Sequence, residues 1–137
     1  MVVDSRGPVL REALAAGVDW AKANLNEAEE TVGQKGVSGC LAGMRKLSRG
    51  QGGHLITQGD RGLVLQMGTK KMAVPAPKIQ VQDATGSGDV VTAALIYGIR
   101  KGWEIGKVAG FAVWAGSENA ARRNKVVARL KRRGVFA

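Results

Sequence analysis

The segment from Asp83 to Asp89, with the sequence DATGSGD, combines two glycines, two hydroxyls and two carboxylates directly before a strongly apolar stretch. The glycines at 86 and 88 let backbone N–H groups converge without interference from Cβ atoms. The predicted helix that follows attracts negative charge at its N-terminus, because the first N–H groups are unpaired and the helix dipole is positive there. Asp89 stands at that end and could accept a proton from a hydroxyl held against the same anion site. Donors for the charge on the transferring group and a base for the attacking oxygen are what phosphoryl transfer needs.

A purely structural role accounts for the same residues. Asp89 would cap its helix, and the glycines would make a turn. A G-x-G pair is a weak signal, and the segment does not match the G-x-x-x-x-G-K-S/T phosphate loop. The residues of this segment alone leave both interpretations open.

The elements that must position this segment alternate between short apolar runs and helical periodicity. Strands are predicted at residues 2–4, 18–24, 54–57 and 63–65. Helices are predicted at residues 8–16 (closed by Gly17), 26–33 (capped by Asn26), 37–47, 89–99 and 104–121. Pro75 and Pro77 indicate an irregular extended connection before the DATGSGD segment. This order is typical of an α/β sandwich.

Length and composition narrow the class of protein. The 137 residues allow one domain, and 45% of them are apolar. No window approaches 18 uninterrupted apolar residues, and this excludes a transmembrane helix. The N-terminus lacks the order of a secretory signal, which favours a cytoplasmic location. The single cysteine, Cys40, cannot form an internal disulfide and has no neighbours at metal-ligand spacing. The single histidine, His54, is interpreted as strand packing and Cys40 as a small core residue.

The net charge of +10 is concentrated at the C-terminal end of the sequence. Residues 121–137 hold seven bases and no acids, so the remaining fourteen bases and eleven acids give the body only +3. Such a basic helix or tail can bind nucleic acid. The alternative is a solvated helix end, which we favour because the segment holds one aromatic residue and no recognisable binding module. A modestly positive body suits an anionic, phosphate-bearing ligand, although charge alone does not choose one.

The DATGSGD segment with its apolar helix resembles the second signature of the ribokinase-like carbohydrate kinases, the phosphofructokinase B family, commonly D-T-x-G-A-G-D. Three further segments fall in that family's order. KANLNE at 22–27 is similar to its K-P-N-x-x-E stretch, TQGDRG at 57–62 to its T-x-G-x-x-G nucleotide loop, and AGS at 115–117 to the A-A-G-S of members specific for phosphorylated hexoses. The opening VDSRG at 3–7 and the connection VPAP at 74–77 resemble the minor 6-phosphofructokinases. Together these matches cover nearly the whole chain.

The resemblance implies a catalytic group at the DATGSGD segment. Asp89 would be the base that takes the proton from the sugar hydroxyl. Gly86, Ser87 and Gly88 would form the anion hole for the γ-phosphate of ATP. Asp83 would lie beside this loop, where many members bind a monovalent cation such as K⁺.

The resemblance also implies a nucleotide site. Asn24 and Glu27 would help to hold Mg²⁺ and its waters beside the triphosphate; the alternative interpretation is a turn residue and a helix N-terminal acid. The groove would be lined by Thr57, Gly59 and Gly62, with Ser117 and Asn119 near the adenine end. Three positions depart from the family pattern, namely Ala23 in place of proline, Ala84 and Ser87.

The expected fold is therefore a ribokinase-like three-layer sandwich, present only as its C-terminal part: residues 1–137 form one partial domain, without the lid and the first strands. The expected activity is ATP-dependent phosphorylation of a sugar or sugar phosphate, with fructose 6-phosphate favoured. Two alternatives remain, a non-catalytic ATP-binding fragment and a nucleic-acid-binding module that uses the basic tail. The expected partners are a nucleotide and a sugar phosphate, together with a second copy or a complementing N-terminal half, and no membrane.

Overall fold

A computed structural model describes residues 1–122 of the chain as a mixed α/β structure. The strands are β1 (Val2–Asp4), β2 (Trp20–Asn24), β3 (Gly53–Thr57), β4 (Leu63–Met67) and β5 (Lys70–Val74). The helices are α1 (Gly7–Ala16), α2 (Leu25–Val32), α3 (Gly36–Leu47), α4 (Ser87–Arg100) and α5 (Ile105–Ala120), with a short 3₁₀ turn η1 (Gly59–Arg61). Most of the basic segment 121–137, its residues 123–137, lies outside the described residues.

The sheet has the strand order β1-β2-β3-β4-β5. β1, β2 and β3 are parallel, whereas β4 and β5 continue the sheet in antiparallel fashion. Asp4 lies opposite Lys22, and Asn24 lies opposite Thr57. The carboxyl ends of the three parallel strands therefore bring four polar residues to one edge of the sheet.

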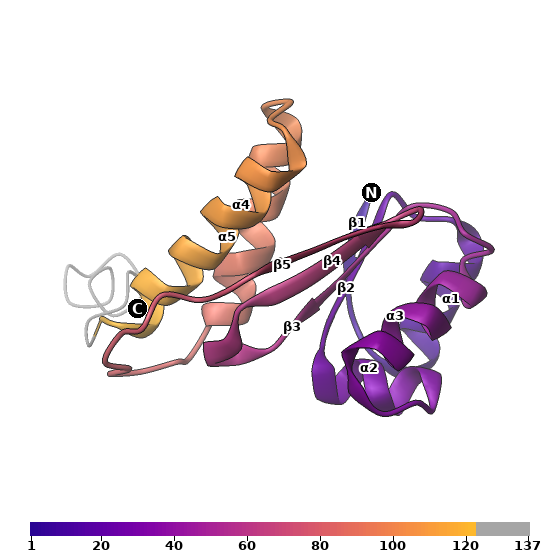
Figure 1. Cartoon of the computed structure of the whole chain (residues 1–137), viewed down its shortest axis with the longest axis horizontal. Helices are drawn as coiled ribbons and strands as arrows, with labels where there is room; N and C mark the ends of the chain where they lie inside the picture. The colour runs from indigo at the N-terminus through magenta and orange to yellow at the C-terminus, as the bar shows by residue number, and fades with distance from the viewer. Residues whose placement is uncertain (123–137) are drawn as a thin grey trace, which may run out of the picture.

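Helices cover both faces of this sheet, which gives the expected three layers (Figure 1). Successive residues of a strand point to opposite faces, and β3 shows this with Leu55 and Ile56. Leu55 packs in a core with α4 and α5, and Ile56 packs in a second core with α1, α2 and α3. The α/β prediction is confirmed.

The helix boundaries follow from local signals, with one correction. Gly17 adopts a left-handed conformation and ends α1, as predicted. The predicted cap of the next helix, Asn26, is wrong: Asn24 caps α2 and Asn26 lies inside it. The reason is a reciprocal capping box, in which Glu27, three residues after Asn24, completes the pair of bonds.

Two further elements differ from the sequence prediction. β5 was not predicted, because only a proline-containing connection was expected in that region. α4 begins at Ser87, two residues before the predicted start at 89, and Gly86 precedes it in a left-handed conformation with φ of 78°. Among residues 1–122, no helix combines the length and apolar character needed to cross a membrane.

Candidate functional site

An open cavity of about 570 Å³ lies between the carboxyl ends of β2 and β3, the turn η1 and the facing ends of α4 and α5. It brings together most residues that the sequence places in a nucleotide and anion site. These are Asn24, Thr57, Gly59, Gly62, Ser87, Gly88 and Ser117. The segments that supply them are far apart in the chain, so their convergence is a result of the fold.

The sequence prediction did not include other parts of this lining. Asp60 comes from η1, and Lys78, Ile79 and Val81 come from the connection between β5 and α4. This connection contains no regular element, and its course follows from the elements at its two ends. No local pattern in the sequence could have placed it over the cavity.

The first turn of α4 offers backbone donors to this cavity. The Ser87 amide is already engaged, because it donates to the Ala84 carbonyl oxygen at 3.1 Å. The amides of Gly88 and Asp89 donate to no backbone carbonyl within residues 1–122. The expected anion hole of Gly86, Ser87 and Gly88 is therefore corrected: the Ser87 amide does not belong to it, and the open donors of this first turn extend to Asp89.

Asp89 is the third residue of α4, and its side chain is exposed. It does not line the cavity, and within the described part of the chain its carboxylate makes no hydrogen bond or ion pair. Asp89 therefore makes no side-chain cap of α4, and its structural contribution is that of an acid in the first turn of the helix, where the helix dipole is positive. A free carboxylate beside open amides can accept a proton from a hydroxyl that binds there.

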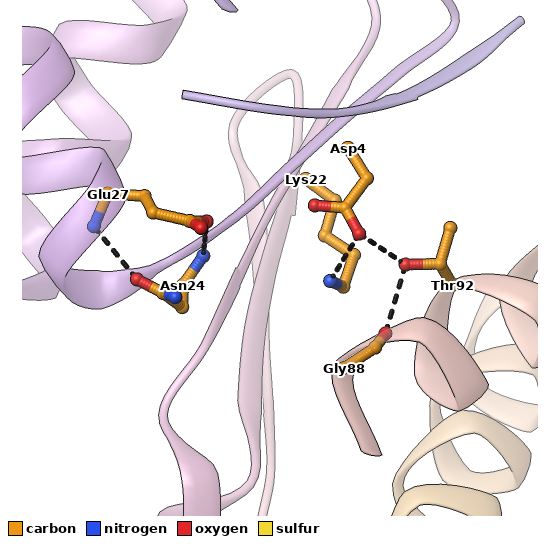
Figure 2. Close-up of polar contacts among 6 residues, drawn as sticks. All are labelled: Asp4, Lys22, Asn24, Glu27, Gly88 and Thr92. Carbon is orange, nitrogen blue, oxygen red and sulfur yellow. Dashed lines mark hydrogen bonds and ion pairs between the residues drawn. The ribbon is translucent and has the colours of Figure 1, made fainter. Parts of the chain in front are cut away.

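Asn24 and Glu27 face each other across the start of α2 (Figure 2). Asn24 Oδ1 accepts the Glu27 amide hydrogen bond at 2.8 Å, and Glu27 Oε2 accepts the Asn24 amide at 3.0 Å. One carboxylate oxygen, Glu27 Oε1, takes no part in this box. Both side chains thus have the capping role that the sequence left open, and they keep oxygen lone pairs for a further ligand.

Asp83 and Asn119 lie beside the cavity and do not form part of its lining. Asp83 Oδ1 accepts the Thr85 amide at 2.9 Å and so shapes the loop before α4. Asn119 donates to the Thr85 carbonyl oxygen at 3.1 Å and to Ser87 Oγ at 2.9 Å. These two bonds direct the Asn119 amide group to the loop, and its place near the adenine end stays a prediction.

Metal binding by protein groups alone is not supported in the described residues. No three of the His, Cys, Asp and Glu side chains between residues 1 and 122 come together to hold a metal ion. Asn24 and Glu27 nevertheless supply the oxygen ligands that Mg²⁺ prefers. They fit a hydrated ion that takes its other ligands from nucleotide phosphates.

A polar network at the ends of β1 and β2 was missed by the sequence prediction (Figure 2). Lys22 Nζ donates to Asp4 Oδ2 at 3.0 Å, and Thr92 Oγ1 donates to the same oxygen at 2.7 Å. The Thr92 hydroxyl also lies 3.1 Å from the carbonyl oxygen of Gly88. The network connects the sheet edge to the first turn of α4, and opposite charges at the ends of adjacent predicted strands were the only available signal.

The Lys22 side chain is only 5% exposed, against 28% for Asp4. A buried ammonium group is unfavourable unless a partner compensates its lost hydration. Asp4 supplies that compensation, and its own exposed portion remains in contact with water. The pair therefore fixes the direction of Lys22 toward the start of α4.

Comparison with protein families identifies the family of the chain. The sequence model of the family described as "pfkB family carbohydrate kinase" matches residues 1–128 of the chain. The chain belongs to the pfkB family of carbohydrate kinases. A search of curated proteins found no match.

Solved structures of other pfkB-type kinases and ribokinases share the fold. Ribokinase from Arabidopsis thaliana, complexed with ribose and ATP, is 24% identical with a TM-score of 0.80, over 93% of this chain and 43% of that one. Escherichia coli phosphofructokinase-2, in complex with substrates and products, is 22% identical with a TM-score of 0.77, over 88% and 41%. Thermotoga maritima ribokinase is 20% identical with a TM-score of 0.76, over 89% and 42%. The pfkB-family chain described here spans about two fifths of the length of these structures.

Proposed function

We propose that this chain is the nucleotide-binding and catalytic portion of an ATP-dependent sugar kinase. The observation that carries the proposal is the first turn of α4, where the open amides of Gly88 and Asp89 adjoin the free Asp89 carboxylate at the edge of the cavity. Membership of the pfkB family supports the same chemistry. The AGS motif at 115–117 and the VDSRG motif at 3–7 favour a ketohexose phosphate such as fructose 6-phosphate as the acceptor.

Asp89 would act on the sugar hydroxyl. The hydroxyl oxygen forms a bond to the γ-phosphorus, its proton passes to Asp89, and the bond between the γ-phosphorus and the β–γ bridging oxygen breaks to release ADP. The amides of Gly88 and Asp89 donate to the γ-phosphate oxygens as charge develops on them. A general base contributes about 10²- to 10⁴-fold to the rate of such a step.

The nucleotide would occupy the side of the cavity formed by Thr57, Gly59 and Gly62. Gly62 is required there on geometric grounds, because a Cβ atom would lie 2.0 Å from the Val74 carbonyl oxygen. Asn24 and Glu27 would hold the water shell of Mg²⁺, and Ser117 would contact the far end of the nucleotide. When bound, Mg²⁺ would offset the charge of the phosphates. Asp83 would hold a monovalent cation beside the loop.

The decisive experiment measures ADP release from MgATP and fructose 6-phosphate. We expect turnover by the unaltered chain and a loss of at least about 100-fold in Asp89→Asn, which keeps the size of the side chain and removes its basicity. Glu104→Gln is the matched control, because Glu104 is an exposed acid at the start of α5, another helix. Equal rates in the unaltered chain and Asp89→Asn would exclude Asp89 as the base.

A second candidate function is ATP binding without phosphoryl transfer. It is favoured by the coverage of only about two fifths of the related structures, which leaves a separate sugar-binding part to be supplied. Thermal stabilisation by MgATP without ADP release from any sugar phosphate would support it. A second copy of the chain or a complementing N-terminal half is then the proposed partner, and adding that half would restore turnover.

A further inference from the structure

The loop before α4 is fastened to the last turn of α5. The amides of Gln82 and Asp83 both donate to the Ala120 carbonyl oxygen, at 2.9 and 3.1 Å. From the same turn of α5, Asn119 Nδ2 donates to the Thr85 carbonyl oxygen and to Ser87 Oγ. Four hydrogen bonds therefore connect two segments that are more than thirty residues apart in sequence.

The two bonds of Asn119 differ from those of Ala120 in what they control. Ala120 accepts from the entry of the loop, at Gln82 and Asp83, through a backbone atom that any residue possesses. Asn119 reaches the exit of the loop, where Ser87 is the first residue of α4. A side-chain amide with two N–H donors can hold the Thr85 carbonyl and the Ser87 hydroxyl at once.

Ser87 is also one of the positions at which this chain departs from the D-T-x-G-A-G-D pattern, which has alanine there. The serine hydroxyl supplies the acceptor for Asn119 that an alanine could not supply. Gly86, just before it, has a φ of 78°, and the turn is closed by the hydrogen bond from the Ser87 amide to the Ala84 carbonyl oxygen. The bond between Asn119 and Ser87 adds a contact from α5 to this turn.

We propose that Asn119 is a positioning residue for anion binding: through Thr85 and Ser87 it holds the first turn of α4, so that the Gly88 and Asp89 amides face the cavity. In this role Asn119 acts on the anion site through the loop. The identity of the anion as the γ-phosphate of ATP rests on the proposed function. The positioning itself rests only on the hydrogen bonds of the loop.

Hydrogen exchange in the absence of nucleotide tests the positioning directly. In Asn119→Ala we expect the Ser87 and Thr85 amides to exchange about tenfold faster, since the substitution removes both hydrogen bonds that α5 makes to the exit of the loop. The Gln82 and Asp83 amides serve as internal references, because their acceptor is a backbone carbonyl that the substitution leaves in place. Glu118→Ala is the matched control, since Glu118 is the preceding residue of α5 and pairs with Arg122, across 3.7 Å.

The affinity for MgATP tests the consequence for the site. We expect the dissociation constant to rise about tenfold in Asn119→Ala and about threefold in Ser87→Ala, which removes one of the two bonds. The double variant should bind no more weakly than Asn119→Ala alone, because both substitutions break the same link. Ser87→Ala removes a single oxygen atom and keeps the test available if Asn119→Ala does not fold.

The two proposals can fail separately. Unchanged exchange of the Ser87 and Thr85 amides in both variants would overturn the positioning role. So would independent, additive losses of MgATP affinity, because these would indicate that Asn119 contacts the nucleotide itself. Faster loop exchange in a chain whose unaltered form binds no MgATP would leave the positioning role supported and would overturn the proposed function instead.

Discussion

His54 and Gln66 form a buried polar pair on neighbouring strands, remote from the cavity. Each is only 2% exposed. Gln66 Nε2 donates to the Leu41 carbonyl oxygen at 2.7 Å and lies 3.0 Å from His54 Nδ1, which therefore accepts its second hydrogen. Burial, followed by the positive charge of Arg45, lowers the pKa of His54 from its ordinary value of 6.5. The pair thus favours the neutral imidazole in the folded protein.

This lowered pKa predicts that acidification destabilises the fold. Below pH 6.5 the unfolded chain binds a proton at His54 that the folded chain does not bind. The free energy of unfolding therefore decreases as the pH is lowered, until the pH reaches the pKa of His54 in the folded protein. The loss reaches at most about 1.4 kcal/mol per pH unit in that window. Urea unfolding between pH 7.5 and 5.5 measures it, and His54→Gln should show a flatter profile. Parallel profiles for the two proteins would contradict the assignment.

The pair of Asp4 and Lys22 predicts two substitutions with unequal costs. Asp4→Ala leaves a nearly buried ammonium group without its partner and should reduce the free energy of unfolding by about 3 kcal/mol. Lys22→Met leaves a carboxylate that water can still reach and should cost about 1 kcal/mol. Urea unfolding of both variants and of the double variant provides the measurement. Equal decreases in the free energy of unfolding for the two single variants would show that the difference in burial between Lys22 and Asp4 does not affect stability.

At the scale of elements, α4 and α5 approach each other closely through glycine. A Cβ atom at Gly116 would lie 2.7 Å from Val91 Cγ2, whereas one at Gly110 would meet no atom within 4 Å. Both glycines lie inside α5, so they differ mainly in what faces them. This difference provides a test of the packing with an internal control.

We expect Gly116→Ala to lower the free energy of unfolding by about 1–3 kcal/mol, because the new methyl group must displace Val91. Gly110→Ala should instead raise it by up to about 1 kcal/mol, since alanine favours a helix over glycine. Thermal unfolding of the two variants compares them directly. A stabilised Gly116→Ala protein would contradict the close packing of α4 on α5.

Elements with strong local signals could be predicted from the sequence, and elements that depend on a distant partner could not. α1 is marked by Pro8 near its start and Gly17 at its end, and both predictions are confirmed. β5 has two exposed lysines, Lys70 and Lys71, and forms by pairing with β4. α5 is apolar nearly all round, so its periodicity did not show which face is covered, and its Trp114 is 53% exposed.

The same division applies to the site. Motif spacing was enough to select Thr57, Gly59 and Gly88, which the fold brings to one cavity. The contact of Asp4 with Thr92 joins residues that are 88 positions apart, and no local sequence pattern predicts it. The role of Ser87 also depended on a tertiary neighbour, Asn119. Sequence motifs therefore identify residues that line the cavity better than residues that hold those residues in place.

At the scale of the whole molecule, charge is distributed unevenly along the chain. Residues 123–137, outside the described part, contain six bases and no acid, so the rest of the chain carries fifteen bases against eleven acids. The nucleic-acid alternative predicts a non-specific affinity for a short DNA duplex that falls steeply with salt and is lost when residues 123–137 are deleted, whereas a solvated helix end predicts no such affinity. Salt-dependent duplex binding that survives the deletion would assign it to the body of the protein.

The attachment of the loop to Ala120 has a practical consequence for anyone who trims or tags this polypeptide. The end of α5 is secured by the Ala121 and Arg122 amides, which donate to the Ser117 and Asn119 carbonyls. A fusion partner or a protease cut placed directly after Ala120 would fray that turn. It would thereby weaken the hydrogen bonds from Gln82 and Asp83 to the Ala120 carbonyl oxygen, which hold the DATGSGD loop. Reporter proteins should be joined beyond Arg122, through a flexible spacer.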